Sequence, residues 1–334
     1  MNSPTRAGGF TLIEMLTVVA IFGVVAMYVG RILIVNERAY HTVENTSESQ
    51  QNLRVFGELI EDDLRHAGMM VSRDSAVCGR DAANAPDILY VSDAAAIDPQ
   101  DDFDPYDGAV IAGGPLNLNT NGTSQTLTLA SLVIEPSPPN RPAYDTDGNG
   151  VLDSDFRIGG GVIVSDPADP SRGNACGRIT GVNVGASTIT VVGVAAMASA
   201  GSGLVAVPAN EYRLDGTTLR WNGVALADGI EDFQVGYVFD FDGDNVIDTA
   251  PDEKRSSSTS GVGSTPFASS ELPPNQMREI EVALVSRSRQ TDATFRGRPQ
   301  ALLNRTPVTT TDGFRRRTLQ TRVLLRNLAT RIGS

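Results

Sequence analysis

The stretch that decides the fold is residues 8–16, which read Gly-Gly-Phe-Thr-Leu-Ile-Glu-Met-Leu. It opens an apolar run from Phe10 to Gly30 that contains one charged residue, Glu14, and that Arg31 closes. Roughly 20 apolar residues are needed to cross a bilayer as a helix, so this run is just long enough. The sequence therefore predicts a membrane-spanning or filament-core helix close to the amino terminus.

The small residues stand in an unusual place relative to this run. A secretory signal peptide has its small-residue cleavage site after its apolar region. Here Gly8 and Gly9 precede the apolar run and follow a short polar leader whose cation is Arg6. Cleavage after Gly9 would remove residues 1–9, leave the helix attached to the mature chain, and make Phe10 the new amino terminus.

Glu14 is the ionisable side chain within the apolar run. A charge inside a membrane costs several kcal/mol unless it is paired, which makes such a residue a functional candidate. Glu14 lies four residues after Phe10, about one helical turn. Its carboxylate could neutralise the terminal amine of a neighbouring subunit, or it could be a charge tolerated at the membrane edge. The residues alone leave both interpretations open.

Residues 9–16 resemble the class III signal of type IV pilins and type II secretion pseudopilins, with Gly9, Phe10 and Glu14 at the family's spacing. The resemblance implies that a prepilin peptidase cuts between Gly9 and Phe10 and methylates the new amine. It implies a single-pass inner-membrane protein with a periplasmic head that later enters a pilus, with other minor pilins and the major pilin as partners. Many major pilins have a proline where this chain has Arg31, so helix melting is not expected there.

After residue 30, no proline or turn cluster interrupts the chain before Gly68. Apolar residues at three- and four-residue spacings predict an amphipathic helix, whose stripe is Val43, Leu53, Phe56, Ile60, Leu64 and Ala67. We expect one helix from about Thr11 to about His66, with Gly68 as a left-handed cap. Residues 51–68 resemble the end of the helix in PilW-like minor pilins and in the related pseudopilin J. Residues 322–327 resemble the last strand of the PilW group.

The rest of the chain predicts a β-rich head, because glycine, proline and small polar residues separate short apolar runs. Short apolar runs predict strands over residues 88–91 and 162–164. Alternating apolar positions predict half-buried antiparallel strands over residues 126–131, 233–239, 280–284 and 319–325. Residues 254–276, rich in Ser, Gly and Pro, predict a long exposed loop.

The expected fold class is therefore α+β, a long N-terminal helix packed on an antiparallel β-rich head. Its expected parts are a cleaved leader (1–9), a transmembrane or filament-core helix (10–30), an amphipathic continuation (31–68) and a β-rich periplasmic head (69–334).

Two acidic loops predict structural calcium sites, because Ca²⁺ takes six to eight oxygen ligands and alternating carboxylates supply them. The first loop would offer Asp145, Asp147, Asn149, the carbonyl of Val151, and Asp153. Phe156 stands where a bidentate Glu is usual, and Asp155 could serve instead. The second loop would offer Asp240, Asp242, Asp244, the carbonyl of Val246, and Asp248. The alternative is two acidic hairpin turns that bind no metal.

Cys78 and Cys176 are the only two cysteines. In an exported chain a pair of cysteines predicts a disulfide, and the alternative is two free buried thiols.

Composition argues against nucleic-acid binding and against most catalysis. The net charge of −13 repels nucleic-acid phosphates. The chain has two histidines, His41 and His66, and both lie on the expected helix. No Ser-His-Asp set, Cys-His pair or zinc spacing can be assembled from them, although a carboxylate-pair hydrolase stays open. We expect a subunit without enzymatic activity. The resemblance to PilW-like minor pilins implies that it primes or caps pilus assembly in a complex with other minor pilins. The alternatives are a type II secretion pseudopilin and a calcium-dependent tip adhesin.

Overall fold

The computed structural model describes residues 11–80, 82, 84–93, 96, 108–112, 123–132, 154–195, 203–240, 254–255, 274–292, 295–303 and 305–329. Contacts divide the chain into two units, residues 1–48 and residues 49–334. The second part of the long helix therefore belongs to the same unit as the strands.

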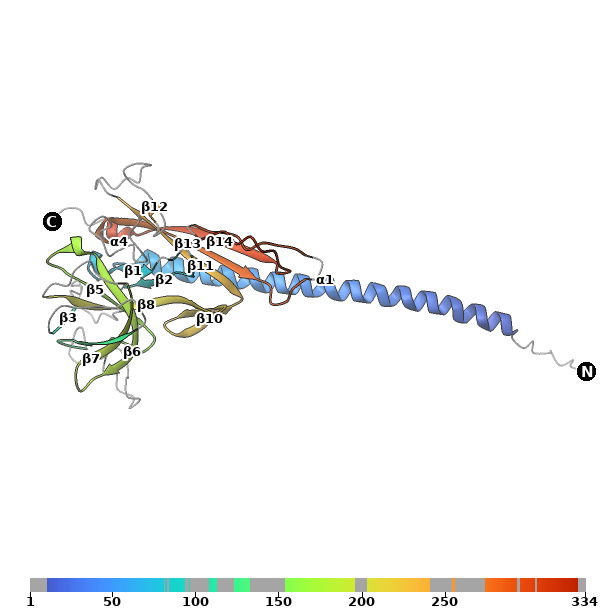
Figure 1. The fold of residues 1–334 in the computed structure, drawn as a ribbon, viewed down its shortest axis with the longest axis horizontal. Helices are drawn as coiled ribbons and strands as arrows, with labels where there is room; N and C mark the ends of the chain where they lie inside the picture. Colours follow the sequence, from blue (N-terminus) through green and yellow to red (C-terminus); the bar gives the residue numbers. More distant parts are fainter. Residues whose placement is uncertain are drawn as a thin grey trace, which may run out of the picture. The chain divides into compact units, whose positions relative to one another are not determined.

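The long helix α1 (Leu12–His66) begins and ends within a residue of its predicted bounds (Figure 1). The hydroxyl of Thr11 accepts a hydrogen bond from the backbone N–H of Glu14 (3.4 Å). In return, the backbone N–H of Thr11 donates to the Glu14 carboxylate (3.4 Å). Such a reciprocal pair is a capping box, which satisfies backbone donors at the start of a helix that have no intrahelical partner.

The carboxyl end of α1 is closed by Gly68 and Asn327. Gly68 has a φ of +76°, as predicted for a left-handed cap. The side-chain amide of Asn327 donates to the backbone carbonyls of His66 (3.3 Å) and Ala67 (3.2 Å), which have lost their helical partners. Asn327 lies in α4 (Arg326–Ala329), so the last described turn of the chain caps the long helix.

The described part of residues 49–334 contains two antiparallel sheets. The larger sheet has the order β1-β2-β8-β5-β6-β7-β4, with β3 and the β9–β10 hairpin joined to β8. Its strands are β1 (Val77–Arg80), β2 (Ile88–Val91), β3 (Ala109–Val110), β4 (Ser124–Thr128), β5 (Gly161–Ser165), β6 (Asn174–Asn183), β7 (Thr188–Ala195), β8 (Val205–Asp215), β9 (Thr218–Trp221) and β10 (Val224–Asp228).

The smaller sheet has the order β12-β11-β13-β14. Its strands are β11 (Ile230–Phe239), β12 (Lys254–Arg255), β13 (Met277–Arg287) and β14 (Arg316–Leu324). Three short 3₁₀ helices complete the described elements: η1 (Arg73–Ser75), η2 (Pro170–Arg172) and η3 (Pro274–Gln276).

The predicted stripe of α1 is confirmed wherever its side chains are described. Leu53, Phe56, Ile60, Leu64 and Ala67 are all buried, while the side chain of Val43 lies outside the described part. The Phe56 ring makes T-shaped contacts with two aromatic rings, Tyr212 of β8 (5.9 Å between centroids) and Phe233 of β11 (6.4 Å). Phe56 therefore packs against both sheets at once. A second buried cluster is formed by side chains of β3 to β8 of the larger sheet and includes Phe156.

Each predicted strand overlaps an observed one, but two details of the prediction were wrong. β11 and β13 are buried on both faces rather than half-buried. One face packs on α1, and segments distant in the sequence cover the other, where Gln234 donates to the carbonyl of Ala85 (3.1 Å) and Arg305 pairs with Asp232 (3.1 Å). Residues 254–276 were expected to form one loop, yet they include β12 and η3; residues 256–273 lie outside the described residues.

Candidate assembly surfaces

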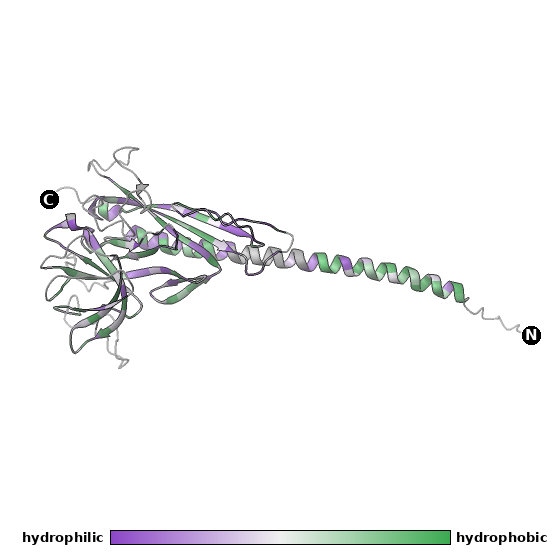
Figure 2. Cartoon of the chain, viewed as in Figure 1, coloured by the Kyte–Doolittle hydropathy of each residue, from purple (hydrophilic) through white to green (hydrophobic). Residues whose placement is uncertain are grey.

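The first part of α1 is apolar on every side. Within Leu12–Glu37 an 18-residue stretch reaches a mean hydropathy of 2.5, and none of that stretch is buried within the chain. Figure 2 shows hydrophobic colouring around this stretch of the helix. The 26 residues of Leu12–Glu37 span about 39 Å at 1.5 Å per residue, more than the roughly 30 Å of a bilayer's hydrocarbon core. An apolar surface of this extent requires lipid or other apolar helices around it.

Glu14 sits at the start of this surface, exposed and held by its own chain. Besides the Thr11 backbone, the Thr11 hydroxyl donates to the Glu14 carboxylate (3.3 Å). These bonds are long, and an ionised carboxylate has about four lone-pair positions, so Glu14 retains capacity for another donor. The predicted processing residues Gly9 and Phe10 lie outside the described residues, and pairing of Glu14 with a neighbour's amine stays a prediction. The capping role was missed, although Thr-x-x-Glu is its sequence signature.

The disulfide is confirmed. Cys78 of β1 and Cys176 of β6 are bonded, with their Cα atoms 6.1 Å apart, and both are fully buried. The two residues are 98 positions apart in the sequence. In the chain-entropy model a loop of that length is worth roughly 4–5 kcal/mol of stability. A disulfide is also typical of proteins that fold in an oxidising compartment.

The proposed calcium ligands are mostly beyond the reach of the structure, since residues 145–153 and 241–253 lie outside the described residues. Asp240 is described and buried, and its carboxylate accepts a hydrogen bond from Arg278 Nε (3.1 Å), whose side chain is also buried. One of its two oxygens therefore already has a cationic partner. The side chain of Phe156 belongs to a core cluster and has no oxygen that could bind a metal. Among the described residues no group of three His, Cys, Asp or Glu could hold a metal.

A polar network that the sequence did not predict links α1 to β8. The Tyr212 hydroxyl and the Asn210 amide (3.4 Å) both donate to the carboxylate of Asp63. Burial raises the pKa of Asp63 to about 6, against the lowering effect of the Tyr212 hydrogen bond. On the same strand, burial raises the pKa of Glu211 to about 7, although Tyr90 donates to it (2.9 Å). The burial of Asp63 was not predicted, because the sequence shows it only as an acidic residue between apolar positions of the helix.

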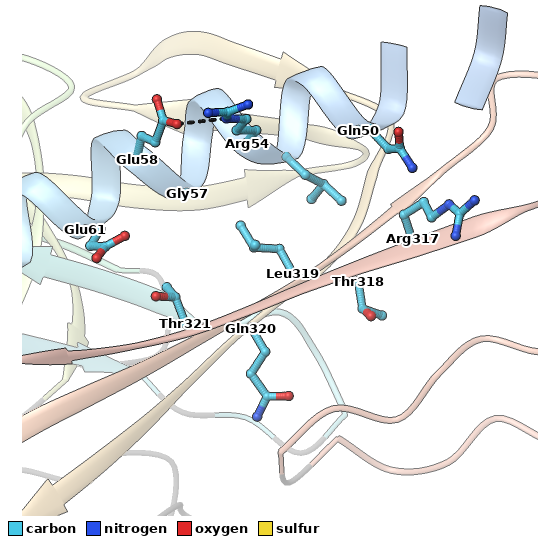
Figure 3. A pocket seen from close by; sticks show the side chains of 11 residues that line it. Gln50, Arg54, Gly57, Glu58, Glu61, Arg317, Thr318, Leu319, Gln320 and Thr321 are labelled. Atoms are coloured by element: carbon cyan, nitrogen blue, oxygen red, sulfur yellow. Dashed lines mark hydrogen bonds and ion pairs between the residues drawn. The ribbon is translucent and has the colours of Figure 1, made fainter. Parts of the chain in front are cut away.

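A groove of about 480 Å³ runs between α1 and β14 (Figure 3). On the helix it is lined by one stripe: Gln50, Leu53, Arg54, Gly57, Glu58 and Glu61. On the strand it is lined by five consecutive residues, 317–321. The helix and strand approach closely because Gly57 has no Cβ; the Leu319 side chain fills that space. No pattern in the sequence predicts this groove, because its two walls are more than 250 residues apart.

The groove has charges of both signs, and most are paired. Arg54 Nε lies 3.0 Å from Glu58, and Glu61 pairs with Arg65. Arg317 is exposed, and no carboxylate within the described residues forms an ion pair with it. Figure 3 shows Arg317 near Gln50 at one end of the groove, with Glu58 and Glu61 toward the other.

Comparison with known proteins gives two family matches. A model of the prokaryotic N-terminal methylation motif matches residues 4–29, and the model of the type IV pilus-assembly protein W matches residues 198–327. The second range runs from just before β8 to Asn327, the residue that caps α1. No curated protein matches the sequence.

Among solved structures, a type IV-like pilin from Thermus thermophilus is similar over 52% of this chain and 88% of that chain, at 13% identity and a TM-score of 0.23. A TM-score this low does not establish a shared fold. The methylation motif at the start of the chain and the pilus-assembly protein W match near its end both support a place in the type IV minor pilin family.

Proposed function

We propose that this protein is a minor pilin that primes or caps a type IV pilus, in a complex with other minor pilins. The observation that carries the proposal is the unburied apolar surface of α1 over Leu12–Glu37, which overlaps the prokaryotic N-terminal methylation motif matched at residues 4–29. A helix that is apolar all round must be covered by lipid or by other helices. Membrane anchoring before assembly and packing in a filament core afterwards both satisfy that requirement.

The same helix explains how the subunit is held in place. Cleavage after Gly9 by the prepilin peptidase would leave Phe10 as a methylated amino terminus one turn before Glu14. A neighbour's amine could then use the lone pairs of Glu14 that the capping box leaves free. The anchor would lie in the inner membrane with residues 49–334 in the periplasm, an oxidising compartment that suits the Cys78–Cys176 disulfide. Pilin-family proteins are generally structural, and we propose no catalysis.

The test is a count of surface pili, by electron microscopy, in a clean deletion strain, its parent and the complemented strain. We expect pili to disappear on deletion and to return on complementation. An unchanged pilus count would overturn the priming role. Two further assays on the same strains separate the alternatives: loss of type II secretion would indicate a pseudopilin, and loss of adhesion with normal piliation would indicate a tip adhesin.

We also propose that the first acidic loop, which includes Asp145 and Asp147, binds Ca²⁺ as a structural ion. Extracellular sites of this kind have dissociation constants of about 0.1–1 mM. At a few millimolar Ca²⁺, binding should stabilise the folded protein by roughly 1–2 kcal/mol. The measurement is the free energy of unfolding in Ca²⁺, in Mg²⁺ and in chelator, for the parent and for Asp147→Asn. Equal stability of the parent in Ca²⁺ and chelator would refute the site.

A further inference from the structure

β14 is an edge strand with an open side. In the described part of the chain it pairs only with β13. The backbone N–H of Leu325 donates to the carbonyl of Arg278 (2.7 Å), so odd-numbered residues in this register direct their backbone groups toward β13. The backbone N–H and C=O groups of Thr318, Gln320 and Arg322 therefore point away from the sheet. All three residues are exposed.

The groove lies along this open edge. Side chains alternate between the two faces of a strand, yet five consecutive residues of β14 line the groove. The groove therefore reaches the edge of the strand and is not confined to the face that carries Leu319. The helix stripe that includes Gln50 and Glu61 forms the opposite wall (Figure 3). A strand placed here would extend the smaller sheet next to β14 and lie against α1.

The charges that line the groove indicate which side chains an added strand should have. Glu58 and Glu61 are compensated by arginines of their own helix, whereas Arg317 pairs with no carboxylate in the residues described. The uncompensated charge at the groove is therefore positive. Charged side chains on an edge strand also discourage indiscriminate pairing, so a strand that supplies a carboxylate at this position would be selected over one that does not.

We propose that the groove between α1 and β14 binds an extended acidic segment of another protein, which adds to the smaller sheet beside β14 and places a carboxylate at Arg317. In this mode of recognition, main-chain hydrogen bonds supply affinity and the alternate side chains supply specificity. The proposal concerns residues 49–334 and requires neither processing nor membrane insertion. It therefore stands or falls separately from the role in piliation.

The experiment uses the purified full chain in detergent micelles and a short labelled peptide of alternating valine and threonine with glutamate at one position. Binding is followed by fluorescence anisotropy, and backbone exchange is followed amide by amide. At a peptide concentration about ten times the dissociation constant, the amides of Thr318, Gln320 and Arg322 should exchange roughly tenfold more slowly. The neighbouring odd-numbered amides, already bonded to β13, should change little. Unchanged exchange of the three outward amides at about millimolar peptide would overturn the proposal.

Matched variants locate the contact. Thr318→Pro removes an outward N–H and no bond to β13, and should weaken peptide binding by roughly tenfold. Thr318→Ala keeps that N–H and should bind within about twofold of the parent. Parental affinity of a Thr318→Pro variant whose odd-numbered amides remain protected would contradict strand addition.

A second variant tests the charge and does not depend on how proline is tolerated. Arg317→Ala should weaken binding of the glutamate peptide by about two- to fivefold and abolish its advantage over a lysine analogue. Equal affinity of the parent for the two peptides would refute the acidic specificity. Protection of the outward amides that rises with protein concentration and without peptide would assign the edge to a second copy of this chain, and would also overturn the proposal.

Discussion

The two ends of α1 belong to one continuous helix, yet they differ in what completes them. From Leu12 to Gly30 every face is apolar apart from Glu14, and none of these residues is buried. From Leu53 onward one apolar stripe is buried. Phe22 is 72% exposed and Phe56 is 2% exposed. The chain covers the second half of its helix with its own two sheets and leaves the first half to lipid or to other subunits. The stability of residues 49–334 should therefore depend on the part of α1 from Leu53 onward, and assembly should depend on Leu12–Glu37.

The largest expected effect comes from truncating the same residue type in each half. Phe56→Ala removes a ring packed against Tyr212 and Phe233, and should lower the free energy of unfolding by about 3–5 kcal/mol. Phe22→Ala is the matched control and should leave the stability of the head unchanged. Denaturant unfolding of the full chain in micelles, followed by the fluorescence of Trp221, the one tryptophan, measures both. An equal loss of unfolding free energy in the two variants would contradict the proposed difference between the two halves of α1.

The second expected effect concerns pH and the buried side of α1. Because the pKa of Asp63 is raised from 3.8 to about 6, the folded protein keeps this proton at pH values where the unfolded chain has released it. The contribution of Asp63 to stability is therefore greatest below about pH 4 and decreases as the pH rises to about 6. Asp74, with a pKa raised to about 6 by burial, and Glu211 act in the same direction.

Asp63→Asn removes this titration and keeps an oxygen that can accept from Tyr212. The loss of unfolding free energy between pH 4 and pH 7 should be smaller than in the parent by roughly 1–3 kcal/mol. Asp62→Asn, at a side chain that is 68% exposed, controls for the loss of one charge from the helix. Equal pH dependence of the Asp63 variant and the parent would show that the α1–β8 network does not titrate as described.

Much of this division was predictable from local sequence. The apolar run, the stripe from Leu53 to Ala67 and the cap at Gly68 each follow from spacing along one helix, where neighbours in sequence are neighbours in space. The Cys78–Cys176 bond was predictable because only two cysteines exist. The capping box of Thr11 and Glu14 at the start of α1 was equally local. Its sequence signature was present but overlooked.

The features that could not be predicted from the sequence are contacts between segments that meet only after folding. β11 is buried on both faces because Ala85 and Arg305, far away in the chain, cover the side that α1 does not. Asp63 is buried because β8 brings Asn210 and Tyr212 to it. In the same way the groove exists only because β14 lies beside the helix. Periodicity reports which residues share a face, but it does not report what that face meets.

The most direct test of the account is the pilus count in the deletion strain complemented with Glu14→Gln. Glutamine can still close the capping box with Thr11, but it carries no charge for a neighbour's amine. We predict that the variant protein is processed and accumulates at the parental level, while the number of surface pili falls toward that of the deletion strain. A parental number of pili would contradict the account, because it would confine Glu14 to capping its own helix.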